Sequence, residues 1–429
     1  MSLSKLKWSF ILVFFFKYSY LPLAAQYGTF SPEDHNLSTF KDTISHWIPR
    51  SASFVKFGID NLIELHFEPL RGKRVAVVCH TASRTRHQKE TIRVLLESKE
   101  IIVVKAIIVS YDSLVSFGRG NTLDHGIPCT IVHSPSTLSS ADFVGSEAVI
   151  VDLLDIGIHP SPSIGYLLTI LNACAEISIP VYILDRPNPF DGLTIDGPIA
   201  DMNPEIPIPY LHGMTIGELA LMLNEEGLLS HNSLRSTALR CSLFVVKMRR
   251  WRRSMTWEDI GIPWSTPYLR IPTLSALRGM ALLERIEKLD IVSVGIGTNF
   301  PYQLIGAPDF DEQLIKHLRQ FLYLYGISSD RIEFVPEIGT FAGRLCRGLK
   351  LSFPSDLAMN YHSVGNLILI ELVKFYAPLK THLSKKKYHC SLLKGNQTML
   401  VFPPEKYLLQ IARENENFLK RRHRYLLYP

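Results

Sequence analysis

The sequence of 429 residues has none of the short motifs that mark metal centres or nucleotide-binding sites. Its six cysteines lie far apart, and they form neither a Cys-x-x-Cys pair nor a cluster with histidine at zinc-binding spacing. The first apolar strand is followed by CHTASRTR rather than by a glycine-rich dinucleotide motif, and no Walker-type phosphate loop is present. We therefore expect no metal site and no nucleotide cofactor. One disulfide is compatible with an oxidising compartment, but nothing in the sequence selects a pair.

Strong charge of either sign is also missing. Lys and Arg number 46 against 40 Asp and Glu, which gives a formal net charge of +6. Nucleic-acid binding requires a clustered basic face, so we expect no nucleic-acid partner. The basic runs at residues 249–253, 385–387 and 420–424 are interpreted as solvated faces, with anion or surface binding as the less favoured alternative.

Long apolar runs are scarce. Residues 8–16 form a short apolar stretch after Lys5 and Lys7, and small residues end at Ala25. This pattern predicts a signal peptide over residues 1–25, with an uncleaved anchor as the alternative. The run is shorter than the roughly 20 residues that a membrane span needs, and no later run is longer. The sequence therefore predicts a periplasmic or secreted protein with no transmembrane span in the mature chain.

Short apolar runs alternate with amphipathic stretches from residue 74 onward. The length of 429 residues allows two or three domains, and hydrophobic residues make up 46% of the chain, enough for a sizeable core. Continuous apolar strands separated by helical patterns indicate a parallel sheet covered on both faces. We predict an α/β fold, with a Rossmann-like domain over residues 26–235 and a smaller α+β domain over 236–429. The expected strands of the first domain are residues 74–79, 101–109, 127–132, 148–154 and 180–184.

Ligands of parallel sheets bind outside the carboxyl ends of the strands. The loops that follow the five expected strands are therefore the candidate site. They cover residues 80–87, 110–124, 133–137, 155–163 and 185–197.

Several motifs resemble one known family. They are FGIDNL at 57–62, LRGKRVAVV at 70–78, LDRPNPFDG at 184–192, DGPIAD at 196–201, HGMTIGELA at 212–220 and GIPW at 261–264. In order and spacing they resemble the NamZ-type exo-β-N-acetylmuramidases, formerly a domain of unknown function, over nearly all of the mature chain. The resemblance implies a Rossmann-like catalytic domain, a smaller C-terminal domain and a pocket between them. It also implies release of N-acetylmuramic acid from the non-reducing ends of peptidoglycan fragments.

The DRPNP motif follows the last expected strand. Asp185 and Arg186 are expected to form a charge-assisted pair that fixes the loop, and two prolines stiffen it. Asn188 then either offers its amide to a sugar hydroxyl or belongs to a purely structural corner; the sequence favours neither.

The HGMTIGELA motif predicts the start of a helix. Thr215 is a plausible N-cap, and Glu218 three residues later completes a capping box, so we assign Glu218 a structural role. His212 lies just before the helix and is the better candidate for a ligand-binding side chain.

This sequence differs from the family's motifs at the positions where the family's catalytic and substrate-binding residues are expected. The family's Ser-Pro-Glu-His-Gly motif, which carries its proposed catalytic Glu, is Ser-Tyr-Asp-Ser-Leu at residues 110–114, so Asp112 replaces the Glu. An Asp carboxylate reaches less far by one C–C bond, about 1.5 Å. At residues 155–163 an Arg and two Tyr of the family are replaced, and its Pro-Ser-Pro-Asn is Pro-Tyr-Leu-Arg at 267–270. A similar Ser-Pro-Glu segment at 31–35 is not at a strand end, and we discount it.

Two functional hypotheses follow from the resemblance and from these differences, and a third hypothesis remains open. The first is a glycoside hydrolase acting on a peptidoglycan-derived sugar, with Asp112 as the catalytic acid. The second is a non-catalytic relative that binds a cell-wall fragment, such as a muropeptide, or a protein partner in the same cleft. An unrelated activity on the same fold is the third. The predicted substrate-binding residues are His80, Asp155, His159, Arg186, Asn188 and His212.

Overall fold

The computed structural model describes residues 54–111, 126–199, 206–229, 239–266, 268–354, 359–385 and 404–429. The chain divides into two units, Met1–Ser53 and Phe54–Pro429, and every described residue belongs to the second unit. The predicted signal peptide at residues 1–25 lies outside the described residues. Within these ranges, no helix is both long and apolar enough to cross a membrane.

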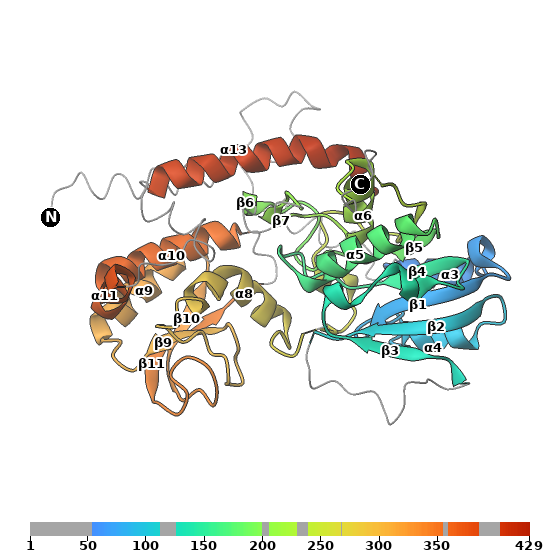
Figure 1. Ribbon diagram of the computed structural model, residues 1–429. Coiled ribbons are helices and arrows are strands. Elements are labelled where there is room, and N and C mark those ends of the chain that lie inside the picture. The colour runs from blue at the N-terminus through green and yellow to red at the C-terminus, as the bar shows by residue number, and fades with distance from the viewer. Residues whose placement is uncertain are drawn as a thin grey trace, which may run out of the picture. The chain divides into compact units, whose positions relative to one another are not determined.

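The larger sheet has six parallel strands in the order β3-β2-β1-β4-β5-β8 (Figure 1). This order confirms the predicted α/β class, because it is that of a doubly wound sheet. The order reverses between β1 and β4, so the carboxyl ends of these two strands form the topological switch point. The strands are β1 (Arg74–His80), β2 (Ile102–Val109), β3 (Cys129–Val132), β4 (Ala148–Asp152), β5 (Val181–Leu184) and β8 (Leu243–Val246).

The edge strand β8 extends this sheet beyond the predicted domain boundary at residue 235. The sequence assignment placed residues 243–248 in the second domain, but Val181 to Leu184 of β5 pair in parallel with Leu243 to Val246. The Rossmann-like sheet is therefore completed by a strand that lies about sixty residues further along the chain than β5.

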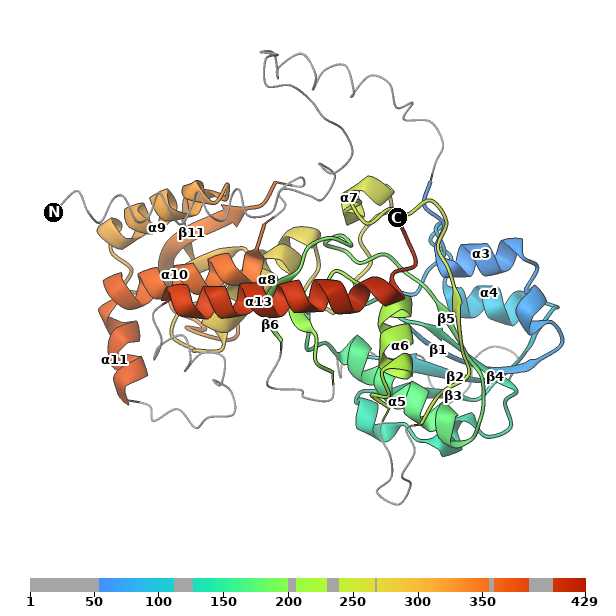
Figure 2. The same cartoon turned by 90° about the horizontal axis from the view of Figure 1, so that it is seen from above.

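Helices cover both faces of the six-stranded sheet (Figures 1 and 2). Alternate residues of β1 face opposite sides, as the pleat of a strand requires. Ala76 and Val78 join the core with α5 and α6, whereas Val75 and Val77 join the core with α3 and α4. The helices are α3 (Gly58–Glu64), α4 (Thr91–Glu97), α5 (Pro162–Glu176) and α6 (Ile216–Glu225).

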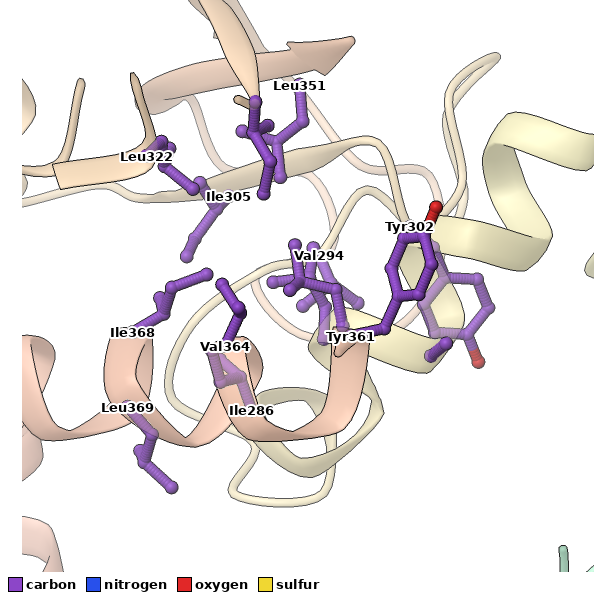
Figure 3. Packing of buried hydrophobic residues seen from close by; sticks show 14 of the residues in the cluster. Ile286, Val294, Tyr302, Ile305, Leu322, Leu351, Tyr361, Val364, Ile368 and Leu369 are labelled. Atoms are coloured by element: carbon purple, nitrogen blue, oxygen red, sulfur yellow. The ribbon is translucent and has the colours of Figure 1, made fainter. Parts of the chain in front are cut away.

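A three-stranded antiparallel sheet and several helices form the predicted α+β part. The strand order is β10-β11-β9, and the core lies between this sheet and the helices, where Val294, Ile305, Val364 and Ile368 pack together (Figure 3). The elements are α8 (Leu274–Glu287), β9 (Leu304–Ala307), α9 (Glu312–Leu324), β10 (Ser328–Phe334), β11 (Cys346–Ser352), α10 (Tyr361–Phe375) and α11 (Ala377–Lys385).

The C-terminal helix α13 (Pro404–Arg422) joins the two cores (Figure 2). Ile411 packs in the core of the α+β part, and Phe418 packs in the α5 and α6 core of the large sheet. The helix contacts β6 (Asp196–Ile199), which pairs with β7 (Pro209–Leu211). The last residues continue into the large-sheet domain, so the end of the chain stabilises the first domain.

Two of the basic runs are solvated faces only in part: Arg249, Arg250, Arg252, Lys420 and Arg424 are exposed, as predicted, but three other arginines of these runs are not. Arg253 is 5% exposed and pairs with Glu218, and Arg422 is 3% exposed. Arg421 binds Glu226 through a salt bridge. These cations are held by carboxylates and backbone carbonyls inside the fold. Residues 386–387 of the third run lie outside the described part of the chain.

Candidate functional site

The switch point brings the end of β1 against the segment that follows β4. His80 ends β1, and its Nε2 accepts a hydrogen bond from the Leu154 N–H at 2.7 Å. Its Nδ1 lies 3.0 Å from the Ser83 hydroxyl, which in turn donates to the Asp152 carbonyl at 2.5 Å. Burial and the charge of Arg186 lower the pKa of His80 to about 4, so the ring is neutral. Both ring nitrogens serve to connect β1 to β4.

The buried ion pair beside this connection differs from the expected one. Arg186 pairs with Asp152 rather than with Asp185: its Nη2 donates to Asp152 Oδ2 at 2.7 Å, and its Nε also contacts that carboxylate. The side chains are 3% and 0% exposed. Successive side chains of an extended segment point to opposite faces, so Arg186 points away from the Asp185 carboxylate and toward the neighbouring strand.

Asp185 is held by a different set of donors. Its carboxylate accepts hydrogen bonds from the Thr215 hydroxyl and the Gly217 N–H, both at 2.8 Å, and from the Tyr428 hydroxyl at 2.5 Å. Burial raises the pKa of Asp185 to about 6, although these donors oppose the rise. Asp185 therefore anchors both the start of α6 and the C-terminal tail.

The capping box at the start of α6 is confirmed. The Glu218 N–H donates to the Thr215 hydroxyl at 3.2 Å, and the Thr215 N–H donates to the Glu218 carboxylate at 3.0 Å. The same carboxylate binds Arg253 at 2.7 Å. Glu218 thus has the structural role that the sequence indicated.

Asn188 also has its polar atoms engaged within the protein. Its amide donates to the Met214 carbonyl at 3.1 Å, and its Oδ1 accepts from the Phe190 N–H at 3.0 Å. Gly157 lies directly against it with a φ of +76°, and a Cβ there would come within 2.5 Å of the Asn188 oxygen. The DRPNP corner therefore shapes the loop that follows β4.

Asp155 occupies the centre of the switch point. Its Oδ2 accepts from the Gly157 N–H at 2.8 Å and lies 3.1 Å from His212 Nε2, while its Oδ1 accepts from the Ser161 hydroxyl at 2.7 Å. Burial raises the pKa of Asp155, but these three hydrogen bonds outweigh it and leave the pKa below its usual value. A carboxylate has about four acceptor positions, and these donors fill three of them.

His212 is held in place from both sides. An isolated bridge between Ile158 and Leu211 brings the end of β7 beside the Asp155 loop. His212 Nδ1 accepts from the Met214 N–H at 3.2 Å, which makes Nε2 the donor to Asp155. Its carbonyl also accepts from Arg422 at 3.1 Å. His212 therefore positions Asp155.

His159 lies on the segment that follows β4 and is 1% exposed. Its ring has a hydrogen bond with the backbone of Ile206. Its backbone N–H donates to the Tyr210 carbonyl at 2.7 Å, which fixes its place next to β7. Burial and the charge of His212 lower its pKa to about 4, so the ring is neutral and can both donate and accept.

Two tyrosines that the sequence analysis did not select lie at this site. Tyr111 follows β2, and Tyr268 lies on the loop before α8; their rings stack with centroids 4.6 Å apart at 12°. The Tyr111 hydroxyl lies 2.9 Å from the Ser163 hydroxyl, which donates to the Leu154 carbonyl. Both tyrosines stand at positions where the family motifs differ from this sequence, and that coincidence is the signal that could have identified them.

The remaining predicted residue, Asp112, lies outside the described residues, directly after Tyr111.

No group of three or more His, Cys, Asp or Glu side chains that could hold a metal ion occurs among the described residues. The five cysteines there are free and buried. What the described site offers chemically is one ionised carboxylate beside hydroxyl and imidazole groups, an arrangement suited to a hydroxyl-rich ligand.

Comparison with known proteins identifies the family. The model for the N-terminal part of exo-β-N-acetylmuramidase NamZ matches residues 75–275, and the model for its C-terminal part matches residues 278–428. The chain belongs to the NamZ family. The resemblance inferred from the motifs is thereby confirmed. The family is of the peptidoglycan exo-β-N-acetylmuramidase type.

Individual NamZ relatives agree with this assignment. The chain is 29% identical over 311 residues to the peptidoglycan β-N-acetylmuramidase NamZ of Bacillus subtilis (strain 168), covering 69% of this chain and 72% of the relative. Two crystal structures of DUF1343 family proteins from Bacteroides fragilis NCTC 9343 have the same fold. One has a TM-score of 0.76 at 24% identity, over 88% of this chain and 100% of the other. The second has a TM-score of 0.62 at 26% identity, over 88% and 99%.

Proposed function

We propose that this protein is a glycoside hydrolase that releases N-acetylmuramic acid from the non-reducing ends of peptidoglycan fragments. Its membership of the NamZ family supports this reaction. The observation that carries the proposal is Asp155, an ionised carboxylate held by three hydrogen bonds at the switch point of the sheet.

Glycoside hydrolysis normally uses two carboxyl groups around an oxocarbenium-like transition state. We assign the ionised role to Asp155, whose negative charge stabilises the positive charge that develops on the sugar ring. We assign the proton donor to Asp112, the carboxylate that replaces the family's Glu. Tyr111 precedes Asp112 directly, and its hydroxyl contacts Ser163 on the Asp155 side of the site.

The substrate-binding assignments divide into two groups. His159 supplies a neutral ring that can donate or accept a hydrogen bond with a sugar hydroxyl. His80, Arg186, Asn188 and His212 instead hold the strand ends, the DRPNP corner and Asp155 in place. Their contribution to binding is through the shape of the site.

A second candidate function is binding of a cell-wall fragment without hydrolysis. One observation favours it: His80, Arg186 and Asn188 direct their side-chain hydrogen bonds to groups within the protein, so these residues have little left to offer a substrate.

Two assays on the same preparation separate these functions. A chromogenic N-acetylmuramic acid glycoside reports turnover, and calorimetry with a muropeptide reports binding. Hydrolysis predicts turnover by the parent protein that is lost in Asp112→Asn. Binding without turnover in the parent, with no gain in Asp112→Glu, would favour the second candidate and contradict the first.

We also propose export through a signal peptide cleaved after Ala25, because Lys5, Lys7 and the short apolar stretch have that pattern. The mass of the mature protein tests this proposal. A chain that begins at Gln26 is expected, and a chain that keeps the Met1 end would contradict it.

A further inference from the structure

Arg422, the last residue of α13, binds the backbone of the turn that carries His212. Its Nη1 donates to the His212 carbonyl at 3.1 Å and to the Gly213 carbonyl at 2.7 Å, and its Nη2 lies 3.5 Å from the Leu193 carbonyl. The side chain is buried, and burial together with the charge of Arg253 lowers its pKa to about 10, so it remains a cation at neutral pH. The described hydrogen bonds of this buried cation therefore go to backbone carbonyls.

Gly213 allows the guanidinium group to approach the turn this closely. Its φ of +56° lies in the left-handed region, where a residue with a Cβ is strained. A Cβ at this position would lie 2.6 Å from Arg422 Nη1 and 2.6 Å from the Thr194 carbonyl oxygen. Arg253 donates to the same Gly213 carbonyl. Because a buried carbonyl needs a donor, the conformation of the turn depends on side chains that lie outside it.

The turn determines where the His212 ring points. Its Nδ1 accepts from the Met214 N–H at 3.2 Å, which ties the ring to the turn, and its Nε2 lies 3.1 Å from Asp155 Oδ2. This contact is one of the hydrogen bonds that keep the pKa of Asp155 below its usual value. A movement of about 1 Å is enough to break a hydrogen bond of this length. Displacement of the turn would therefore take the His212 donor away from Asp155.

The adjacent cation, Arg421, anchors α13 at a different place. It forms a salt bridge with Glu226 at the end of α6, and its Nη1 donates to the Pro207 carbonyl at 2.7 Å. These contacts hold the same end of α13 without involving the His212 turn. Two neighbouring arginines of one helix therefore have contacts that can be removed separately.

We propose that Arg422 is a positioning residue for Asp155, acting through the backbone and the ring of His212. This assignment rests on the proposed function, in which the Asp155 carboxylate stabilises the positive charge that develops on the sugar. It gives the C-terminal helix, which packs in both cores, a role at the site.

Proton NMR of protein with isotopically labelled histidine nitrogens tests this assignment without any substrate. The Nε2–H of His212 donates to a carboxylate, so it should give a downfield signal that is absent in His212→Phe. Arg422→Met removes the guanidinium group and keeps most of the side-chain volume. In Arg422→Met the signal should move upfield or disappear. A signal that stays at the parent position would overturn the assignment.

Arg421→Met is the matched control, because it removes the neighbouring cation of the same helix. It should lower the melting temperature, since Glu226 loses its partner, and it should leave the His212 signal in place. Loss of the signal in Arg421→Met as well would show that docking of α13 as a whole holds the turn, and would overturn the assignment. If Arg422→Met does not fold, Arg422→Gln and Arg421→Gln give the same comparison, because glutamine keeps one amide donor.

Turnover gives a second readout. Misplacement by about 1 Å can cost about 100-fold in rate, so Arg422→Met should lose up to about that factor in kcat, and Arg421→Met should lose much less. Arg422→Met combined with His212→Phe should be no slower than His212→Phe alone, because both changes act on one hydrogen bond. Additive losses in the double variant would contradict the assignment.

The two proposals fail differently. A parent without turnover overturns the hydrolase, while the His212 signal in the two arginine variants still decides whether Arg422 positions Asp155. Turnover in the parent, with an unmoved signal in Arg422→Met, overturns the positioning role alone.

Discussion

Removal of the Arg186 guanidinium should destabilise the fold mainly through the carboxylate that it leaves behind. Arg186 and Asp152 form a buried pair at the carboxyl end of β4, with side chains 3% and 0% exposed. In Arg186→Ala, Asp152 stays in a water-excluded position without its cation. The variant also loses the hydrogen bond from Arg186 to the Arg84 carbonyl at 2.9 Å.

Loss of one partner from a buried pair typically costs about 3–5 kcal/mol. Replacement of both partners by apolar residues of similar volume is far less costly, because no charge remains buried. The double variant Asp152→Leu/Arg186→Met should therefore recover most of the loss seen in Arg186→Ala.

Urea-induced unfolding followed by tryptophan fluorescence measures these differences. The control is Arg71→Ala, because Arg71 pairs with Glu68 and Glu100 at the surface with its side chain 54% exposed. Exposed pairs contribute about 0–1 kcal/mol. If Arg186→Ala costs no more than Arg71→Ala, the reasoning about the buried pair is wrong.

Three further outcomes are expected. Asp112→Asn should reduce turnover by about 100- to 10,000-fold, because a positioned acid contributes that much, and Asp112→Glu should raise turnover. Steady-state kinetics on a chromogenic glycoside measure both effects. Unchanged turnover in Asp112→Asn would exclude Asp112 as the acid. His212→Phe removes a hydrogen bond that lowers the pKa of Asp155. The acidic limb of the pH–rate profile should therefore move to higher pH. An acidic limb at the same pH as in the parent would count against Asp155 as the ionised group. Asp185, with its pKa raised to about 6, contributes stability that is full below pH 4 and is lost as the pH rises through 6. Urea titrations should therefore show the parent losing roughly 2–3 kcal/mol relative to Asp185→Asn from pH 4 to 7, and parallel pH curves for the two proteins would refute this.

The sequence predicts those parts of the fold that depend on local pattern. The apolar run of β1 and the capping box of α6 are both readable because their signals lie within a few residues. The helix α8 is not among the elements that the sequence analysis predicts. Strand pairing depends on contacts between distant segments, which explains why β8 was assigned to the second domain although it pairs with β5.

Prediction of the candidate site is limited in the same way, because contacts between distant segments cannot be read from a local pattern. The position of Asp155 at a strand end follows from the sheet alone. The Arg186–Asp152 pair does not, because it joins neighbouring strands, and the sequence offers the adjacent Asp185 as a more obvious partner. The Tyr111–Tyr268 stack joins segments about 157 residues apart in the chain, so no local pattern contains it.

The most direct test of the central claim is the release of free N-acetylmuramic acid from intact peptidoglycan chains, followed by mass spectrometry over time. The account predicts release from chains whose non-reducing end is N-acetylmuramic acid, at a rate proportional to protein concentration, with little or none from chains capped by N-acetylglucosamine. No release from either substrate, with binding to the first preserved, would contradict the claim that this protein is a hydrolase.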